Sequence, residues 1–122
     1  MAPEDYSRFG EMKAVMHMIY EFRKGVRNLV LCTLCPTCAE IVKERLEGQG
    51  IDYLVRQVGD RKVNLFFGEK WCVDAVSRFV DKPLNLLTPE EDFMLGTMLG
   101  YDIAGQSRRF CERKTRTKFM IN

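Results

Sequence analysis

The feature that most constrains the fold is a pair of short apolar segments separated by a tight turn. Residues 51–58 and 62–67 have the length of strands, and Gly59-Asp60-Arg61 lies between them. A short glycine-containing connection between two such segments is typical of a β-hairpin. The sequence therefore predicts that these two segments pair in one sheet.

A further strand and a helix precede this hairpin. Residues 28–34 are apolar at nearly every position, as in a strand that is covered on both faces or buried at an interface. Pro36 suits the first turn of a helix in which Cys38, Val42 and Leu46 share one face. After the hairpin, residues 71–80 repeat apolar side chains at helical spacing, which predicts another helix.

This order of elements predicts an α/β (α+β) fold: a three-stranded sheet built as a βαββα ferredoxin-like half unit, with an N-terminal helix and additional C-terminal helices. Because the crossover between the first two strands is right-handed, the third strand inserts between them and gives the strand order 1-3-2. The expected core consists of Leu29, Leu31, Leu65, Phe67, Val42, Leu46, Val76 and Phe79.

The expected N-terminal helix covers residues 11–23. Val15 and Ile19 recur there at helical spacing, and Gly25 follows as a C-terminal cap. Part of the segment also alternates like a strand, which is the alternative interpretation. Residues 1–10 show little periodicity and are expected to form a flexible arm.

The clearest helix start is at Thr88. Thr88 can cap the helix, Pro89 fits its first position, and Glu91 completes a capping box. The same geometry explains the acidic residues Glu90, Glu91 and Asp92 without a catalytic role, because carboxylates stabilise a helix N-terminus.

This helix is expected to continue through Gly96 and Gly100 towards Ala104 and to break at Gly105. The three small residues would form a stripe along which two helices can approach closely. The first strand would also leave an apolar sheet edge that needs cover. Together these features predict a homodimer, and packing of the stripe within the chain is the alternative.

The predicted organisation is one domain over residues 11–105, followed by a basic helix or tail over residues 106–122. Apolar residues make up 46% and charged residues 30% of the 122 residues, which is the balance of a folded domain. The apolar segments fall far short of the roughly 20 residues that a membrane span needs. The acidic N-terminus does not resemble a secretory signal, so we expect a cytoplasmic protein without membrane contact.

Three of the five cysteines form a C-x-x-C-x-x-C sequence, Cys32, Cys35 and Cys38. Such spacing suggests zinc or iron–sulfur ligation. A strand residue at Cys32 would, however, lie roughly 10 Å from Cys35, and no turn residues separate the two. The sequence therefore predicts no metal site and no cofactor.

The pair Cys35 and Cys38 is a candidate redox dithiol at a strand-to-helix junction. Amide groups at the helix start would stabilise a thiolate at Cys35. The alternative is that these thiols are small apolar core side chains. No catalytic residue is assigned, because His17 is the only histidine and no nucleotide-binding or hydrolase motif is present.

The basic character of the chain is concentrated near its C-terminus. Residues 106–122 contain six Lys or Arg and one Glu, although the net charge of the whole chain is +2. Such a cluster can dock an acidic protein or a nucleic acid, and a solvated tail is the remaining alternative. The candidate partner-binding residues are Arg108, Arg109, Phe110, Arg113 and Lys114.

Several segments resemble a small bacterial family of domains of unknown function, numbered two thousand and twenty-three. They are His17-Met-Ile-Tyr-Glu-Phe22, Arg27-Asn-Leu-Val-Leu31, Val63-Asn-Leu-Phe-Phe-Gly68 and residues 83–101. The resemblance implies a three-stranded sheet with helices, a homodimer and no assigned activity. Members are often encoded near a flavodoxin, which implies an acidic electron carrier of that kind as a partner. The three clustered cysteines are not part of the family pattern.

Three functions follow from these observations. The sequence favours a small non-enzymatic accessory protein or interaction module, associated with a flavodoxin-type partner. A thiol-redox protein that uses Cys35 and Cys38 is one alternative, and nucleic-acid binding through the basic segment is the other.

Overall fold

The computed structural model describes residues 3–121, with side chains described for residues 8–116. Its contacts divide the chain into two compact units, an N-terminal unit (residues 1–74) and a C-terminal unit (residues 75–122). The division falls inside helix α3 (Lys70–Ser77). The single domain over residues 11–105 stays a prediction.

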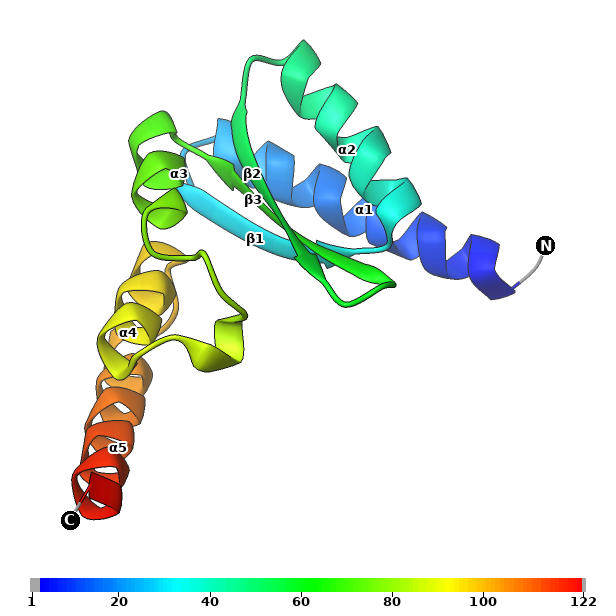
Figure 1. Ribbon diagram of the computed structural model, residues 1–122. Coiled ribbons are helices and arrows are strands. Elements are labelled where there is room, and N and C mark those ends of the chain that lie inside the picture. Colours follow the sequence, from blue (N-terminus) through cyan, green and yellow to red (C-terminus); the bar gives the residue numbers. More distant parts are fainter. Residues whose placement is uncertain (1–2, 122) are drawn as a thin grey trace. The chain divides into compact units, whose positions relative to one another are not determined.

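The sheet of the N-terminal unit has three strands, β1 (Leu29–Leu34), β2 (Asp52–Val58) and β3 (Lys62–Gly68). Both β1 and β2 pair antiparallel with β3, which gives the order β1-β3-β2 (Figure 1). Gly59 has a φ of 64°, the left-handed conformation that a tight hairpin turn needs. The predicted α+β fold and its strand order are confirmed.

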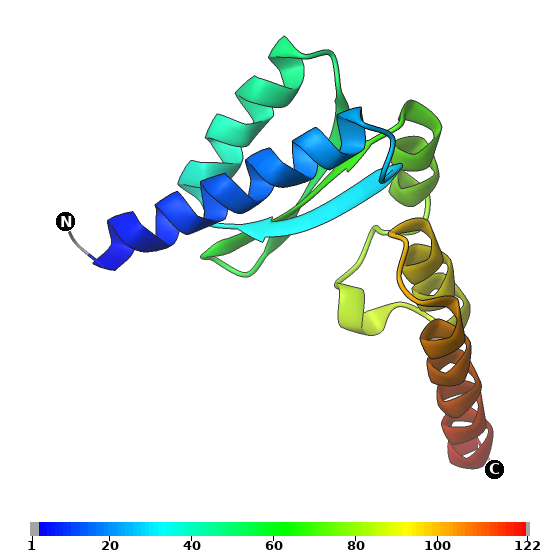
Figure 2. The same ribbon diagram turned by 180° about the vertical axis from the view of Figure 1, so that it is seen from behind.

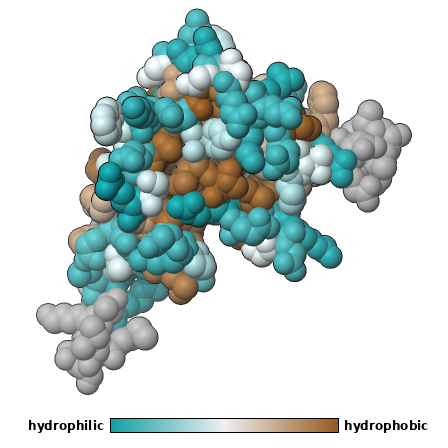
Figure 3. Space-filling view, turned by 45° about the horizontal axis from the view of Figure 1, so that its top comes forward, coloured by the Kyte–Doolittle hydropathy of each residue, from teal (hydrophilic) through white to brown (hydrophobic). Residues whose placement is uncertain are grey.

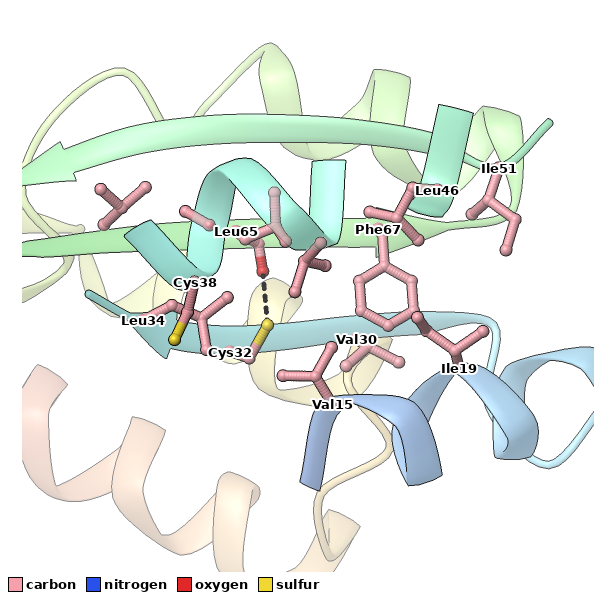
Figure 4. Packing of buried hydrophobic residues seen from close by; sticks show 13 residues of the cluster. Val15, Ile19, Val30, Cys32, Leu34, Cys38, Leu46, Ile51, Leu65 and Phe67 are labelled. Atoms are coloured by element: carbon pink, nitrogen blue, oxygen red, sulfur yellow. Dashed lines mark hydrogen bonds between the residues drawn. The ribbon is translucent and has the colours of Figure 1, made fainter. Parts of the chain in front are cut away.

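Two helices, α1 (Pro3–Arg23) and α2 (Pro36–Gly48), cover one face of this sheet (Figures 1 and 2). Alternate residues of β1 and β3 point towards them, because successive side chains of a strand face opposite sides. The resulting apolar cluster is drawn in Figure 4 and includes Val15 and Ile19 from α1, Val42 and Leu46 from α2, and Val30, Leu65 and Phe67 from the strands.

Helix α1 is helical over the whole of residues 11–23, so the alternative of a strand is wrong there. The helix also begins earlier than expected, at Pro3, and takes in most of the segment that the sequence predicts as a flexible arm. A proline is tolerated in the first helical turn, because its missing N–H would have no intrahelical partner there.

The predicted core is largely found, with two differences. Leu29, Leu65, Phe67, Val42, Leu46 and Val76 are buried. Leu31 is only half-buried, because it lies on the face of β1 opposite to the one that α1 and α2 cover. Phe79 is also half-buried, since α3 ends at Ser77 and does not continue to residue 80 as expected.

In the C-terminal unit, a 3-10 helix η1 (Leu84–Leu86) precedes α4 (Pro89–Met98). The capping box is confirmed. The Thr88 hydroxyl accepts a hydrogen bond from the Glu91 amide at 3.1 Å, and the Glu91 carboxylate accepts one from the Thr88 amide at 2.9 Å. These bonds satisfy two amide groups that a helix start leaves unpaired.

The predicted course of this helix beyond Met98 is wrong. Gly100 has a φ of 82°, a left-handed conformation that ends α4. Helix α5 (Ile103–Ile121) follows, and the Asp102 carboxylate caps its start by accepting a hydrogen bond from the Gly105 amide at 2.8 Å. Gly105 therefore lies inside α5 and does not break it.

As a consequence, Gly96, Gly100 and Ala104 do not form a stripe on one helix. Gly96 is buried in α4, and a Cβ atom there would collide with the Gln106 side chain of α5. Gly100 lies in the connection between α4 and α5, and Ala104 lies in α5. The small residue at position 96 thus permits packing within the C-terminal unit, and the homodimer stays a prediction.

No helix among the described residues combines the length and apolar character that a membrane span requires. Apolar and hydrophilic residues both reach the surface on the face drawn in Figure 3.

Candidate functional site

The start of helix α2 positions the two candidate redox cysteines. Cys35 is the N-cap residue, with extended backbone angles, and Pro36 follows it in the first turn. The Cys35 sulfur accepts a hydrogen bond from the Cys38 amide at a donor–acceptor distance of 3.4 Å. A thiol therefore takes the place that a serine or aspartate oxygen usually has at a helix start. The predicted strand-to-helix junction is confirmed.

The two sulfurs differ in their access to solvent. Cys35 is half-buried, whereas only 1% of Cys38 is exposed and its side chain belongs to the apolar cluster of the N-terminal unit. A reactant from solution would therefore meet Cys35 first, with Cys38 behind it.

Cys32 belongs to the core. It is buried in β1, and its thiol donates a weak hydrogen bond to the Leu65 carbonyl oxygen at 3.7 Å (Figure 4). Burial, together with the negative charge of Glu11, raises the pKa of the Cys32 thiol to about 12. This thiol is neutral and satisfied at physiological pH.

A carboxylate from α1 completes the site. A carboxylate oxygen of Glu11 and the sulfurs of Cys35 and Cys38 all lie within 4.8 Å of one another. Glu11 Oε1 forms an ion pair with the Lys62 Nζ atom of β3 at 3.5 Å. Glu11 Oε2 is buried and has no partner of good hydrogen-bond geometry among the residues with described side chains.

The electrostatics of Cys38 and Glu11 favour a neutral Cys38 thiol beside an ionised carboxylate. Burial is the largest cause that raises the pKa of Cys38, to about 12, and interactions with Cys35 and Glu11 add to it. Burial also tends to raise the pKa of Glu11, but hydrogen bonding from Cys38 and Cys35 and the charge of Lys62 outweigh it and lower this pKa.

This arrangement supports two kinds of chemistry. Two sulfurs at this separation, three residues apart at a helix start, can join in a disulfide after a small movement. The same sulfurs and the carboxylate are also groups that can ligate a metal ion once the thiols lose their protons.

Sequence reasoning missed Glu11, although a signal for it exists. Glu11 precedes Val15 and Ile19 at intervals of four residues, so it lies on the stripe of α1 that faces the core. A carboxylate on a buried stripe needs a partner or a function. The sequence does not reveal which residues it meets, because Cys35 is 24 positions away.

The candidate partner-binding residues of α5 are mostly engaged within the C-terminal unit. Arg109 binds the Asp92 carboxylate at 2.7 Å, and Lys114 binds Glu90 at 2.6 Å. Arg113 donates a hydrogen bond to the Leu87 carbonyl oxygen at 2.9 Å. The acidic start of α4 thus neutralises part of the basic segment.

The remaining two candidates also have partners on the same unit. The Phe110 ring packs against Phe93, with centroids 5.5 Å apart, and Arg108 pairs with Glu112 one helical turn later at 3.0 Å. Arg108 remains largely exposed, with 82% of its side chain accessible.

His17 lies on the exposed surface of α1, where its Nε2 atom is 3.2 Å from Glu21.

Comparison with known proteins gives a family without an assigned activity. No curated protein matches the chain. A family described as "Protein of unknown function (DUF2023)" matches residues 13–113. The match leaves Glu11 just outside its N-terminal limit and includes both cysteines of the candidate site. Since it spans most of the sequence, the chain belongs to the DUF2023 family.

Proposed function

We propose that this chain is a thiol-redox protein in which Cys35 and Cys38 undergo reversible thiol–disulfide exchange with a disulfide-containing partner. The supporting observation is the arrangement of the two sulfurs at the start of α2. An accessible thiol at a helix N-cap lies in front of a buried thiol, and the sulfurs are within 4.8 Å of each other. Exchange needs one attacking and one resolving thiol in this order of access.

The exchange begins at Cys35. Its thiolate attacks one sulfur of the partner disulfide, forms a mixed disulfide and releases the other partner sulfur, which takes up a proton. The Cys38 sulfur then attacks Cys35 Sγ, which breaks the mixed disulfide and releases the second partner thiol. Two electrons pass to the partner, and the two released partner sulfurs take up two protons, which balance the two that Cys35 and Cys38 lose to their surroundings.

Cys38 has to lose its proton during the second step. Burial raises its pKa to about 12, so the free thiolate is scarce at neutral pH. The Glu11 carboxylate lies beside this thiol and is ionised, because its own pKa is lowered. It can therefore accept the proton as the new sulfur–sulfur bond forms.

Equilibration in glutathione redox buffers tests this function. The full chain is trapped by alkylation at each potential, and mass spectrometry measures the thiols that remain. We expect a two-electron transition to a Cys35–Cys38 disulfide at a potential above about −300 mV, the range of labile rather than structural disulfides.

Matched variants assign the transition to the site. Cys35→Ser and Cys38→Ser should abolish it, whereas Cys72→Ser and Cys111→Ser should retain it. A chain in which Cys35 and Cys38 stay reduced at about −180 mV, or in which Cys72 or Cys111 carries the disulfide, refutes the proposal.

An interaction module is the second candidate, and exposed apolar side chains of the C-terminal unit favour it. Leu86, Met94, Tyr101 and Ile103 are between 47% and 63% exposed. Several large exposed apolar side chains in so short a segment are typical of binding surfaces. The partner in this case is a second copy of the chain or an acidic flavodoxin-type protein.

Titration with flavodoxin at low salt, together with light scattering of the chain alone, tests this candidate. The charge reversals Arg108→Glu and Arg116→Glu are the informative variants, since Arg109 and Lys114 hold α5 to α4. Unchanged affinity in these variants refutes charge-steered docking. Binding of single-stranded nucleic acid without binding of flavodoxin supports the nucleic-acid function instead.

A further inference from the structure

The cluster of Glu11, Cys35 and Cys38 has the composition of a metal site. Among the residues with described side chains, this is the one group of three ligand-bearing residues whose ligand atoms all lie within 4.8 Å of one another. A tetrahedral zinc ion with bonds of about 2.0–2.3 Å holds its ligand atoms roughly 3.5–3.8 Å apart. A closure of about 1 Å, which side-chain rotations supply, would bring the three atoms to that spacing.

The environment of the Glu11 carboxylate is the most specific evidence for a metal site. Glu11 Oε2 is buried and forms no hydrogen bond of regular geometry with the described residues, although weaker contacts from the two thiols and the Cys35 amide help to lower the pKa of Glu11. Weak contacts of this kind leave a buried carboxylate oxygen short of the hydrogen bonds it had in water, which is costly. A cation bound between the carboxylate and the two sulfurs would offset that loss.

The local charges would balance around a divalent cation. Two thiolates and the Glu11 carboxylate carry three negative charges, and a divalent cation with the Lys62 ammonium group carries three positive charges. A coordinating metal ion deprotonates a thiol, so both sulfurs would bind the cation as thiolates.

The ligand types select the metal. Thiolates bind soft and borderline cations such as Zn²⁺ and not Ca²⁺ or Mg²⁺, which require oxygen ligands. The spacing Cys35-x-x-Cys38 is one that zinc sites use. The Cys38 amide already donates a hydrogen bond to the Cys35 sulfur, and a hydrogen bond of this kind helps to orient a ligating sulfur. Three protein ligands would leave a fourth position open to water or to a ligand.

We infer that the reduced chain binds one thiophilic divalent cation, of the class of Zn²⁺, through Glu11, Cys35 and Cys38. The inference differs from the sequence prediction of no metal site, which weighed cysteines as ligands and did not include Glu11. It uses the thiols of the proposed exchange but not that reaction, so either can fail while the other holds.

Competition against a chromogenic zinc chelator tests the inference, with the full chain held reduced by a phosphine. We expect one zinc ion per chain, and an affinity at least about tenfold lower in Cys35→Ser, Cys38→Ser and Glu11→Gln. Cys72→Ser and Cys111→Ser are the matched controls and should bind like the native chain. With Co²⁺ in place of Zn²⁺, thiolate-to-cobalt charge-transfer absorption should appear, and at saturating Co²⁺ it should fall by about half in Cys38→Ser, which keeps one of the two thiolates.

Glu11→Asp keeps the carboxylate and should bind more tightly than Glu11→Gln, which separates ligation from a structural role of the side chain. The absence of stoichiometric binding overturns the inference. So does native-like zinc affinity in Cys38→Ser or in Glu11→Gln, or loss of binding in Cys72→Ser or Cys111→Ser. Zinc binding by a chain that never forms the Cys35–Cys38 disulfide refutes only the proposed exchange.

Discussion

Replacing Cys38 with alanine under reducing conditions tests whether this thiol is part of the core as the structure places it. Cys38 is 1% exposed and contributes to the apolar cluster between α1, α2 and the sheet. The substitution removes one heavy atom, the sulfur. A buried group of that size stabilises the fold by about 0.8 kcal/mol through its transfer from water.

The cavity left behind adds to this cost. It is no larger than the share of one water molecule in the liquid, about 30 Å³. At about 24 cal/mol per Å³ such a cavity costs about 0.7 kcal/mol if the surroundings do not relax. The free energy of unfolding should therefore fall by about 1–1.5 kcal/mol for Cys38→Ala. For the half-buried Cys35, the transfer and cavity costs should be about half as large, with a further cost for the lost cap at the start of α2.

Urea unfolding followed by circular dichroism, with a reductant present throughout, measures both changes. The urea concentration at the midpoint of unfolding should fall, while the slope of the free energy of unfolding against urea concentration stays the same, because the variants expose the same surface on unfolding. A loss above about 3 kcal/mol for Cys38→Ala would show that the sulfur does more than fill space. No loss at all would show that the side chain is not buried in solution.

Three further predictions concern the charged and capping groups. The pKa of Glu11 is lowered in the folded chain, so its ionised carboxylate stabilises the fold at pH values above the pKa of an unfolded glutamate. This stability is lost as the pH falls through the lowered pKa. Glu11→Gln should remove this pH dependence of the free energy of unfolding, measured by urea unfolding across the acidic range. Thr88→Ala should cost about 1 kcal/mol in urea unfolding, and Thr88→Ser should retain most of the cap. Asp92→Asn weakens the ion pairs that Asp92 forms with Arg109 and Arg113 and should cost about 1 kcal/mol, with a smaller effect at high salt. An effect that grows with salt would contradict screened ion pairs.

Local sequence patterns predict the fold of the N-terminal unit well. The turn at Gly59 and the proline after Cys35 lie next to the elements that they define, so hairpin and helix start can be located from the sequence. The break between α4 and α5 was missed for a local reason. Gly100 and Asp102 together end one helix and start the next, and that signal competes with an apolar pattern that continues past it.

The candidate site was predicted only in part. Cys35 and Cys38 can be recognised from their spacing, because both lie on one element. Glu11 meets them only through the packing of α1 beside α2, which depends on tertiary contacts between distant segments. The internal pairing of Arg109 and Lys114 was missed for the same reason, since composition shows a basic segment but not the acids that face it.

The N-cap role of Cys35 ties the chemistry of its sulfur to the stability of a backbone turn. The Cys38 amide donates its hydrogen bond to that sulfur, so a bulky adduct or an enforced rotation at Cys35 removes the acceptor and frees this amide. Amide hydrogen exchange at Cys38 therefore reports the covalent state of the neighbouring thiol. Protection at this single position would let covalent modification of Cys35 be followed without a label on either cysteine.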